Sequence, residues 1–172
     1  MNDVERTGVV KFVGHPVTLI GPELKPGDAL PEADTVGEGL DPVKLSSLKG
    51  KVLLILSLPS LDTPVCDKET RAFSVRAGSL GPQIEVVAVS MDLPFAQARW
   101  AREAGVENIT FLSDYRDASF GKAFGVLAKE NRLLARAVFV ADAQGIIRYI
   151  QLMDDVVKEP DYLAAEQAAL AL

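Results

Sequence analysis

The chain has 172 residues, enough for one globular domain with a sizeable core that needs no disulfide support. A hydrophobic fraction of 48% and a charged fraction of 24% exclude a disordered or fibrous protein. The net charge of −6 argues against a nucleic-acid partner, which requires a clustered positive surface. No apolar run approaches the ~20 residues that cross a bilayer, so we expect no membrane association.

The first predicted element is an N-terminal β-hairpin over about residues 8–21. Two β-prone runs, Val9–Val13 and Val17–Ile20, flank the turn-like "GHP". Residues 21–50 follow, rich in Pro, Gly, Asp and Glu and with little periodicity. We expect this stretch to be a loop-rich connection with one short strand at most.

A strand buried on both faces is predicted next, because residues 51–58 form a continuous apolar run between Gly50 and Pro59. A helix then begins near Cys66, with Asp62 or Thr63 as its cap. The later elements in chain order are a strand over 84–91, a helix over 93–105, a strand over 108–114, a helix over 117–126, two strands within 135–152, and an Ala-rich helix after Pro160.

This alternation of strands and helices predicts one α/β domain spanning residues 1–172. A mostly parallel central sheet flanked by helices is the expected architecture, and the last two strands add an antiparallel edge. The chain shows no internal repeat and no linker that would divide it.

Cys66, the only cysteine, raises two possibilities. A lone cysteine is commonly a buried, inert apolar residue. Cys66 however follows a predicted central strand and falls in the first turn of a helix, where free N–H groups and the helix dipole stabilise a thiolate. Thr63 lies one helical turn earlier, so its hydroxyl is either a plain helix cap or a polar group facing the same space as the sulfur. Pro59 ends the strand and can shield the sulfur from water.

The cysteine and histidine counts also limit the chemistry. One cysteine forms no internal disulfide, which suits a reducing compartment, and the acidic start "MNDVERTGVV" does not resemble a secretory signal, so we expect a cytoplasmic protein. The single histidine, His15, is expected to be a turn residue. One histidine cannot assemble a metal site, so no metal is expected.

The stretch "PSLDTPVC" resembles the active-site signature of the peroxiredoxins: proline, three residues, threonine, two residues, cysteine. Together with "TRAF", "SMDLPFAQARW" and "LARAVFV", it resembles the thiol peroxidase subfamily more narrowly, over nearly the whole chain. This resemblance implies a thioredoxin-like fold, a peroxide substrate, a thiol reductant, no cofactor and a homodimer.

The resemblance also assigns roles to residues. Cys66 matches the peroxidatic cysteine, which attacks a peroxide oxygen and becomes a sulfenic acid. Thr63 matches the threonine that binds the peroxide oxygens, and Pro59 matches the proline that shields the site. Arg136, from "LARAVFV", matches the family arginine near the sulfur. Without the resemblance, Arg136 would be interpreted as a surface charge at a strand edge.

Two positions depart from the family pattern. Relatives commonly carry a second, resolving cysteine where this chain has Ala101, and no other cysteine replaces it. The chain is then a natural one-cysteine enzyme reduced by an external thiol, an enzyme recycled through a Cys66–Cys66 disulfide between subunits, or a resolving-cysteine-to-alanine variant. Asp67 stands where relatives often have a small residue, and we expect its carboxylate to point outward, with Arg71 as a surface partner.

Three functions are consistent with these residues. The first is a peroxidase that reduces hydrogen peroxide and organic hydroperoxides, with a thioredoxin-like protein or a low-molecular-weight thiol as the reductant. The second is a peroxide sensor that passes the oxidation of Cys66 to a partner. The third, a disulfide oxidoreductase of the thioredoxin type, is disfavoured because it needs two cysteines and this chain has one.

Overall fold

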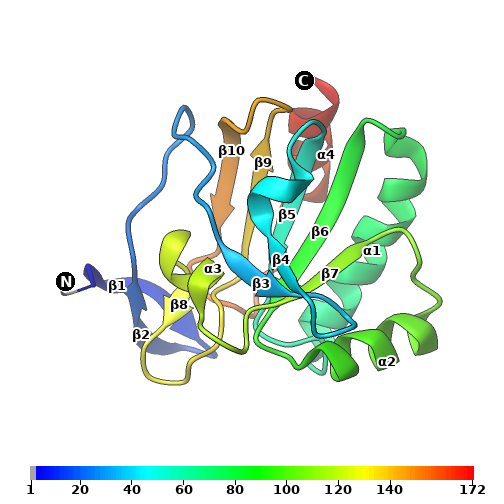
Figure 1. Cartoon of the computed structure of the whole chain (residues 1–172). Coiled ribbons are helices and arrows are strands. Elements are labelled where there is room, and N and C mark those ends of the chain that lie inside the picture. Colours follow the sequence, from blue (N-terminus) through cyan, green and yellow to red (C-terminus); the bar gives the residue numbers. More distant parts are fainter. Residues whose placement is uncertain (1–2) are drawn as a thin grey trace.

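The computed structural model describes residues 3–172, and its central feature is a seven-stranded sheet (Figure 1). The spatial order of the strands is β10-β9-β5-β6-β7-β3-β4. Their bounds are β3 Asp34–Val36, β4 Pro42–Lys44, β5 Val52–Ser57, β6 Ile84–Ser90, β7 Thr110–Ser113, β9 Ala137–Ala141 and β10 Ile147–Leu152.

The sheet is parallel only at its centre, where β5, β6 and β7 run in the same direction. All neighbouring pairs outside this centre are antiparallel, which makes the sheet more mixed than the sequence predicted. The reason lies partly in the tight connections of β9 to β10 and of β3 to β4, since short loops join antiparallel strands. Because β9 is antiparallel to β5, Ala137 pairs with Ser57, and the start of β9 lies beside the end of β5.

The two faces of the sheet are covered by different elements. Leu54 and Leu56 of β5 belong to a core that also contains side chains of the helices α1 (Pro64–Leu80), α2 (Pro94–Ala104) and α4 (Tyr162–Leu170). Leu53 and Ile55 belong to a second core on the opposite face, which includes the short helix α3 (Ser119–Ala123). This alternation explains the continuous apolar run: both faces of β5 are covered.

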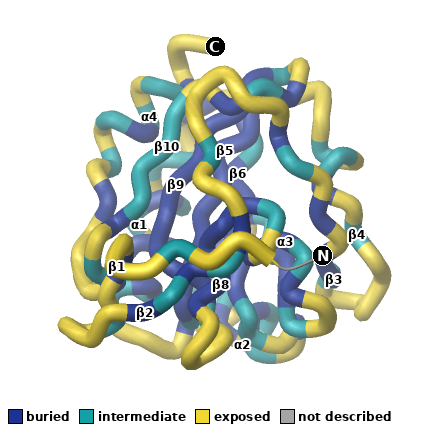
Figure 2. The backbone as a smooth tube through the Cα atoms, turned by 90° about the vertical axis from the view of Figure 1, so that its left-hand side faces the viewer, coloured by how far each residue is buried: buried dark blue, intermediate teal, exposed yellow. Residues whose placement is uncertain are grey.

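The expected N-terminal hairpin is present and forms a small separate sheet. β1 (Glu5–Phe12) pairs with β2 (His15–Ile20), and β2 pairs with β8 (Leu127–Ala128). Val10, Val17 and Leu19 turn inward and join the second core. Figure 2 shows much of β1 exposed on the outside, while β6 and β9 in the central sheet are buried.

Helix α1 begins at Pro64, with Thr63 as its N-cap residue and Cys66 in its first turn, as the sequence predicted. Two segments differ from the sequence-based expectation. Residues 21–50 contain two short strands, β3 and β4, and a 3₁₀ turn over Leu45–Leu48, instead of one strand at most. Helix α3 covers only part of the predicted 117–126, since Gly125 takes a left-handed φ of 66° just after it.

Candidate active site

The sulfur of Cys66 lies in the first turn of α1, directly after the loop that leaves β5. Cys66 is 0% exposed and belongs to the core between the sheet and α1. The helix starts with Thr63 as its N-cap residue and Pro64 in the first turn, and its first bond runs from the Asp67 N–H to the Thr63 carbonyl. The sulfur therefore lies at the positive end of the helix dipole, where a thiolate is stabilised.

Arg136 reaches this sulfur from the start of β9. Its Nη2 donates to Cys66 Sγ over 3.3 Å, its Nη1 donates to Glu69 Oε2, and its Nε donates to the Val156 carbonyl over 2.8 Å. Arg136 is 1% exposed, so the interpretation as a surface charge is wrong. Burial alone would lower the pKa of Arg136, but the negative charges of Glu69 and Cys66 raise it, and the guanidinium stays charged.

Glu69 is the part of the site that the sequence reasoning missed. It lies one turn after Cys66 on α1 and is 0% exposed. Its Oε1 has no hydrogen-bond partner among the residues that the structure describes. Burial raises the pKa of Glu69 to about 7, although Arg136 acts in the opposite direction. The available signal was the three-residue spacing from Cys66, which places both side chains on one face of a helix.

Thr63 and Pro59 lie on the loop before α1. The Thr63 side chain is exposed, and its Oγ1 donates to the Ser60 carbonyl over 2.7 Å. It makes no cap bond to α1, so the interpretation as a side-chain helix cap is wrong. Pro59 is buried at the end of β5. Among the described residues, only Arg136 of the three candidate partners forms a hydrogen bond with the sulfur.

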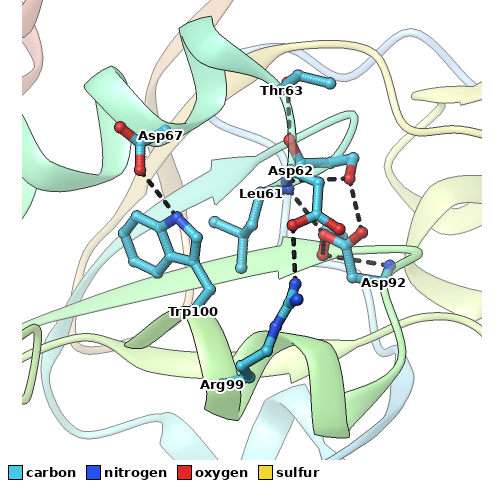
Figure 3. A network of polar contacts seen from close by, with 9 residues as sticks. Leu61, Asp62, Thr63, Asp67, Asp92, Arg99 and Trp100 are labelled. Atoms are coloured by element: carbon cyan, nitrogen blue, oxygen red, sulfur yellow. Dashed lines mark hydrogen bonds and ion pairs between the residues drawn. The ribbon is translucent and has the colours of Figure 1, made fainter. Parts of the chain in front are cut away.

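Asp92 holds this loop in place (Figure 3). One carboxylate oxygen accepts from Ser60 Oγ over 2.7 Å, and the other accepts from the Leu61 N–H over 2.9 Å. Asp92 comes from the motif "SMDLPFAQARW" and directly precedes α2, so this motif fixes the loop that carries Thr63.

Helix α2 adds two further contacts to the same region (Figure 3). Arg99 Nη2 donates to Asp62 over 2.9 Å, and the Trp100 indole N–H donates to Asp67 over 2.9 Å. Asp67 also pairs with Arg71, whose guanidinium lies 5.5 Å from the centroid of the Trp100 ring. The Asp67 side chain is 39% exposed, which agrees with the predicted outward orientation, and Arg71 is its surface partner as predicted.

Residues 25–165 match the Redoxin family model. A thiol peroxidase of Halalkalibacterium halodurans is 49% identical over 94% of this chain and 97% of the relative, and a thiol peroxidase of Bacillus subtilis is 46% identical over 95% and 97%. The chain belongs to the Redoxin family. The resemblance to thiol peroxidases that the sequence motifs indicated is confirmed.

Two solved structures share this fold. A peroxiredoxin-like protein from Aquifex aeolicus superimposes with a TM-score of 0.85 at 40% identity, covering 98% of both chains. A thiol peroxidase from Chromobacterium violaceum gives a TM-score of 0.83 at 26% identity, covering 97% of this chain and 96% of that one. The predicted thioredoxin-like α/β fold is therefore confirmed.

Other features bear on the chemistry open to this Redoxin-family chain. Ala101 lies half-buried on α2 and packs against the core cluster that contains Cys66. No group of three or more His, Cys, Asp or Glu side chains within residues 3–172 is placed to hold a metal ion. Within the same range, none of the helices combines the length and the apolar character that spanning a bilayer requires.

Proposed function

We propose that this chain is a thiol-dependent peroxidase whose nucleophile is the Cys66 thiolate, and that it reduces hydrogen peroxide and organic hydroperoxides. The observation that carries the proposal is the buried contact of 3.3 Å between Arg136 Nη2 and Cys66 Sγ. A fixed positive charge beside a buried sulfur favours the thiolate over the thiol. The names of the relatives, thiol peroxidases at 44–49% identity, support the same class of reaction.

The proposed first step is displacement at oxygen. The Cys66 thiolate attacks one peroxide oxygen, and an S–O bond forms as the O–O bond breaks. The departing oxygen carries the negative charge, takes a proton and leaves as water or an alcohol. Sulfur is oxidised by two electrons to a sulfenic acid, so no metal or organic cofactor takes part.

Three further residues assist this step in the proposal. Arg136 stabilises the thiolate and donates to the departing oxygen as charge develops. Thr63 already donates its hydroxyl hydrogen to the Ser60 carbonyl, so its oxygen is left to accept a hydrogen bond from the peroxide O–H. Pro59, buried on the same loop, limits the access of water to the sulfur.

Recycling is proposed to use an external thiol, because Ala101 leaves Cys66 without a cysteine partner in its own chain. One thiol attacks the sulfenic sulfur, forms a mixed disulfide and releases water. A second thiol then reduces the mixed disulfide and restores the Cys66 thiol. A thioredoxin-like protein or a low-molecular-weight thiol supplies both in the reducing cytoplasm.

A homodimer is part of the proposal. Leu93 and Phe95, at the start of α2, are 48% and 61% exposed, and a second copy of the chain would cover them. Light scattering on the reduced protein tests this assignment, and a Phe95→Glu variant is expected to shift the protein toward the monomer.

A peroxide sensor is the second candidate, and the single cysteine is the observation that favours it. A sulfenic acid with no partner in its own chain persists until another molecule reacts with it. The two functions differ in turnover: a peroxidase consumes many equivalents of peroxide when a reductant is present, whereas a sensor consumes one.

The test combines intact mass with turnover. Reduced protein receives one equivalent of hydrogen peroxide with and without dimedone, beside a Cys66→Ser control, and peroxide consumption is then followed with excess dithiothreitol. A dimedone adduct that is absent from the Cys66→Ser protein, together with many turnovers, supports the peroxidase. A single stoichiometric consumption supports the sensor, and no adduct at all contradicts both.

A further inference from the structure

The tip of the N-terminal hairpin has an unfavourable backbone conformation. Val13 and Gly14 connect β1 to β2 with φ angles of 51° and 81°. Positive φ at both central residues is the pattern of a type I′ turn, which normally uses Asn or Gly and not a β-branched residue. The Val13 side chain is 70% exposed, so apolar burial does not explain why valine is held there. Strain of this kind persists where the surrounding structure holds it.

Asp155 provides that hold. Its Oδ1 accepts from the Val13 N–H over 3.1 Å, and its Oδ2 accepts from the Gly14 N–H over 2.9 Å. Two backbone bonds continue the attachment: the Lys11 N–H donates to the Asp154 carbonyl over 2.8 Å, and the Val156 N–H donates to the Lys11 carbonyl over 3.0 Å. Four hydrogen bonds thus tie the hairpin tip to residues 154–156.

Val156 in this segment and Met153 just before it also form hydrogen bonds with Arg136. The Val156 carbonyl accepts from Arg136 Nε over 2.8 Å, and the Met153 N–H donates to the Arg136 carbonyl over 3.0 Å. A guanidinium is planar and rigid, so the bond at Nε determines where Nη2 points. Nη2 is the atom that contacts Cys66 Sγ. A continuous series of contacts therefore connects the hairpin tip with the sulfur.

We propose that Asp155 is a positioning residue for the peroxidase reaction. It fastens the hairpin tip to residues 154–156 and so fixes the Val156 carbonyl, which aims Arg136 at Cys66. Asp155 does not touch the sulfur or the substrate and acts only through Val156 and Arg136. The inference rests on the proposed function, because it assigns Asp155 to the step in which Arg136 stabilises the thiolate and the departing oxygen.

The chain contains a matched control for this role. Glu130 is also a carboxylate that accepts from a hairpin backbone group, since both of its oxygens lie within 3.0 Å of the Thr18 nitrogen. Thr18 belongs to β2 on the side of β8, and its carbonyl accepts from the Lys129 N–H. Glu130 therefore attaches the same hairpin to the segment that follows β8, at a place other than residues 154–156. A purely structural role would give the two carboxylates similar effects.

The experiment compares Asp155→Ala, Asp155→Asn and Glu130→Ala in the full chain. Stopped-flow measurements give the rate constant with hydrogen peroxide, and iodoacetamide alkylation of Cys66 gives the pH midpoint of thiolate reactivity. We expect Asp155→Ala to lower the peroxide rate constant about tenfold and Glu130→Ala to leave it within about twofold. The alkylation midpoint should rise by about half a unit in Asp155→Ala only, since a misdirected Arg136 stabilises the thiolate less.

A second comparison tests the route through Arg136. In an Arg136→Lys background the side chain has no Nε to be aimed, so Asp155→Ala should cause no further loss of peroxide rate. Asp155→Asn, which keeps one acceptor oxygen, should fall between wild type and Asp155→Ala, and it replaces the alanine variant if that protein does not fold. Val13→Gly relieves the turn and should restore part of the rate in the Asp155 variants.

Equal rates and midpoints for the Asp155 and Glu130 variants would overturn the inference, as would a full additional loss in the Arg136→Lys background. These results require a wild-type protein that turns over peroxide. If wild type and Glu130→Ala both fail to react, the proposed function itself fails, and that outcome is distinct from the loss of the Asp155 effect.

Discussion

Three buried groups adjoin one another at the site: the Cys66 sulfur, the Arg136 guanidinium and the Glu69 carboxyl group. Arg136 contacts both of the others, so an ionised Glu69 competes with the proposed Cys66 thiolate for the same cation. Burial raises the pKa of Glu69 to about 7, and a neutral Glu69 leaves Arg136 to the sulfur. We therefore expect Glu69 to adjust the reactivity of Cys66.

Glu69→Gln tests this competition. Glutamine can still accept from Arg136 but carries no charge, so we expect the pH midpoint of Cys66 alkylation to fall by about half to one unit. The matched control is Glu166→Gln, which removes the charged partner of Arg76. Arg76 lies about 15 Å from Cys66 along the axis of α1. The control should not move the midpoint. A rise in the midpoint of Glu69→Gln would instead mean that the carboxylate is needed to hold Arg136 in position.

Thr63 permits a test that separates the substrate from the sulfur. Thr63→Val removes the oxygen that is proposed to accept from the peroxide, so the peroxide rate constant should fall about 10²-fold. Alkylation by iodoacetamide needs only the thiolate and should change less than about threefold. Thr63→Ser keeps the hydroxyl and should restore most of the peroxide rate. If the valine variant keeps the wild-type peroxide rate, the role assigned to Thr63 is wrong.

At the scale of elements, the position of Arg136 depends on the direction of one strand. The sequence places Arg136 just before a buried strand, and in a fully parallel sheet that position would lie at the edge opposite Cys66. Antiparallel pairing of β9 with β5 brings it to the end of β5, where α1 begins. Strand direction follows from long-range pairing and not from local pattern, so the resemblance predicted Arg136 while periodicity could not.

Local pattern did predict the other main parts of the fold. Apolar runs gave the positions of β5, β6 and β9, since strands covered on both faces are apolar throughout. The local pattern did not predict structure that depends on contacts between residues far apart in the sequence. The two strands β3 and β4 complete the sheet edge beyond β7, and their short, polar sequences carry no signal of that pairing. The partners of Glu69 and Asp155 were hidden for the same reason.

Helices α1 and α2 provide a prediction about Ala101. Trp100 contacts Asp67 across the two helices, so residue 101 lies on a helix already packed against the start of α1. An Ala101→Cys variant treated with one equivalent of peroxide should lose two hydrogens and form a disulfide with Cys66, whereas the wild type gains one oxygen. Ala98→Cys, on the same helix but outside the core cluster of Cys66, should gain oxygen without forming that disulfide.

Because Cys66 is fully buried, this disulfide requires a local opening of α1 or α2. A peptide map under non-reducing conditions identifies the linked pair. The absence of a 66–101 link in Ala101→Cys, with the sulfenic acid formed normally, would contradict the assignment of position 101 to the missing cysteine.

At the scale of the whole molecule, we expect two buried carboxyl groups with raised pKa values to dominate the pH dependence of stability between about pH 5 and 7. Burial raises the pKa of Glu69 to about 7 and that of Asp114 to about 6, while the reference values are 4.5 and 3.8. Asp114 is buried at the start of α3, where it accepts from the N–H groups of Phe120 and Gly121. Each group binds its proton more tightly in the folded state, so its ionisation at higher pH weakens folding.

The free energy of unfolding of the reduced protein should therefore decrease as the pH rises from about 5 to about 7.5. Exposed carboxylates with lowered pKa values, such as Asp154 and Glu159, are already ionised in both states over this range and contribute no slope. A shift from 4.5 to about 7 makes the contribution of Glu69 about 3 kcal/mol. Urea unfolding at several pH values measures the decrease.

Glu69→Gln should flatten much of this decrease, and Glu103→Gln, an exposed glutamate on α2, should retain it. Glutamine at position 69 keeps the acceptor for Arg136 and has no proton to lose, so the decrease that remains between pH 5 and 7 is the part due to Asp114. A wild-type stability that rises over this range, or an equal slope in Glu69→Gln, would show that Glu69 is already ionised at pH 5.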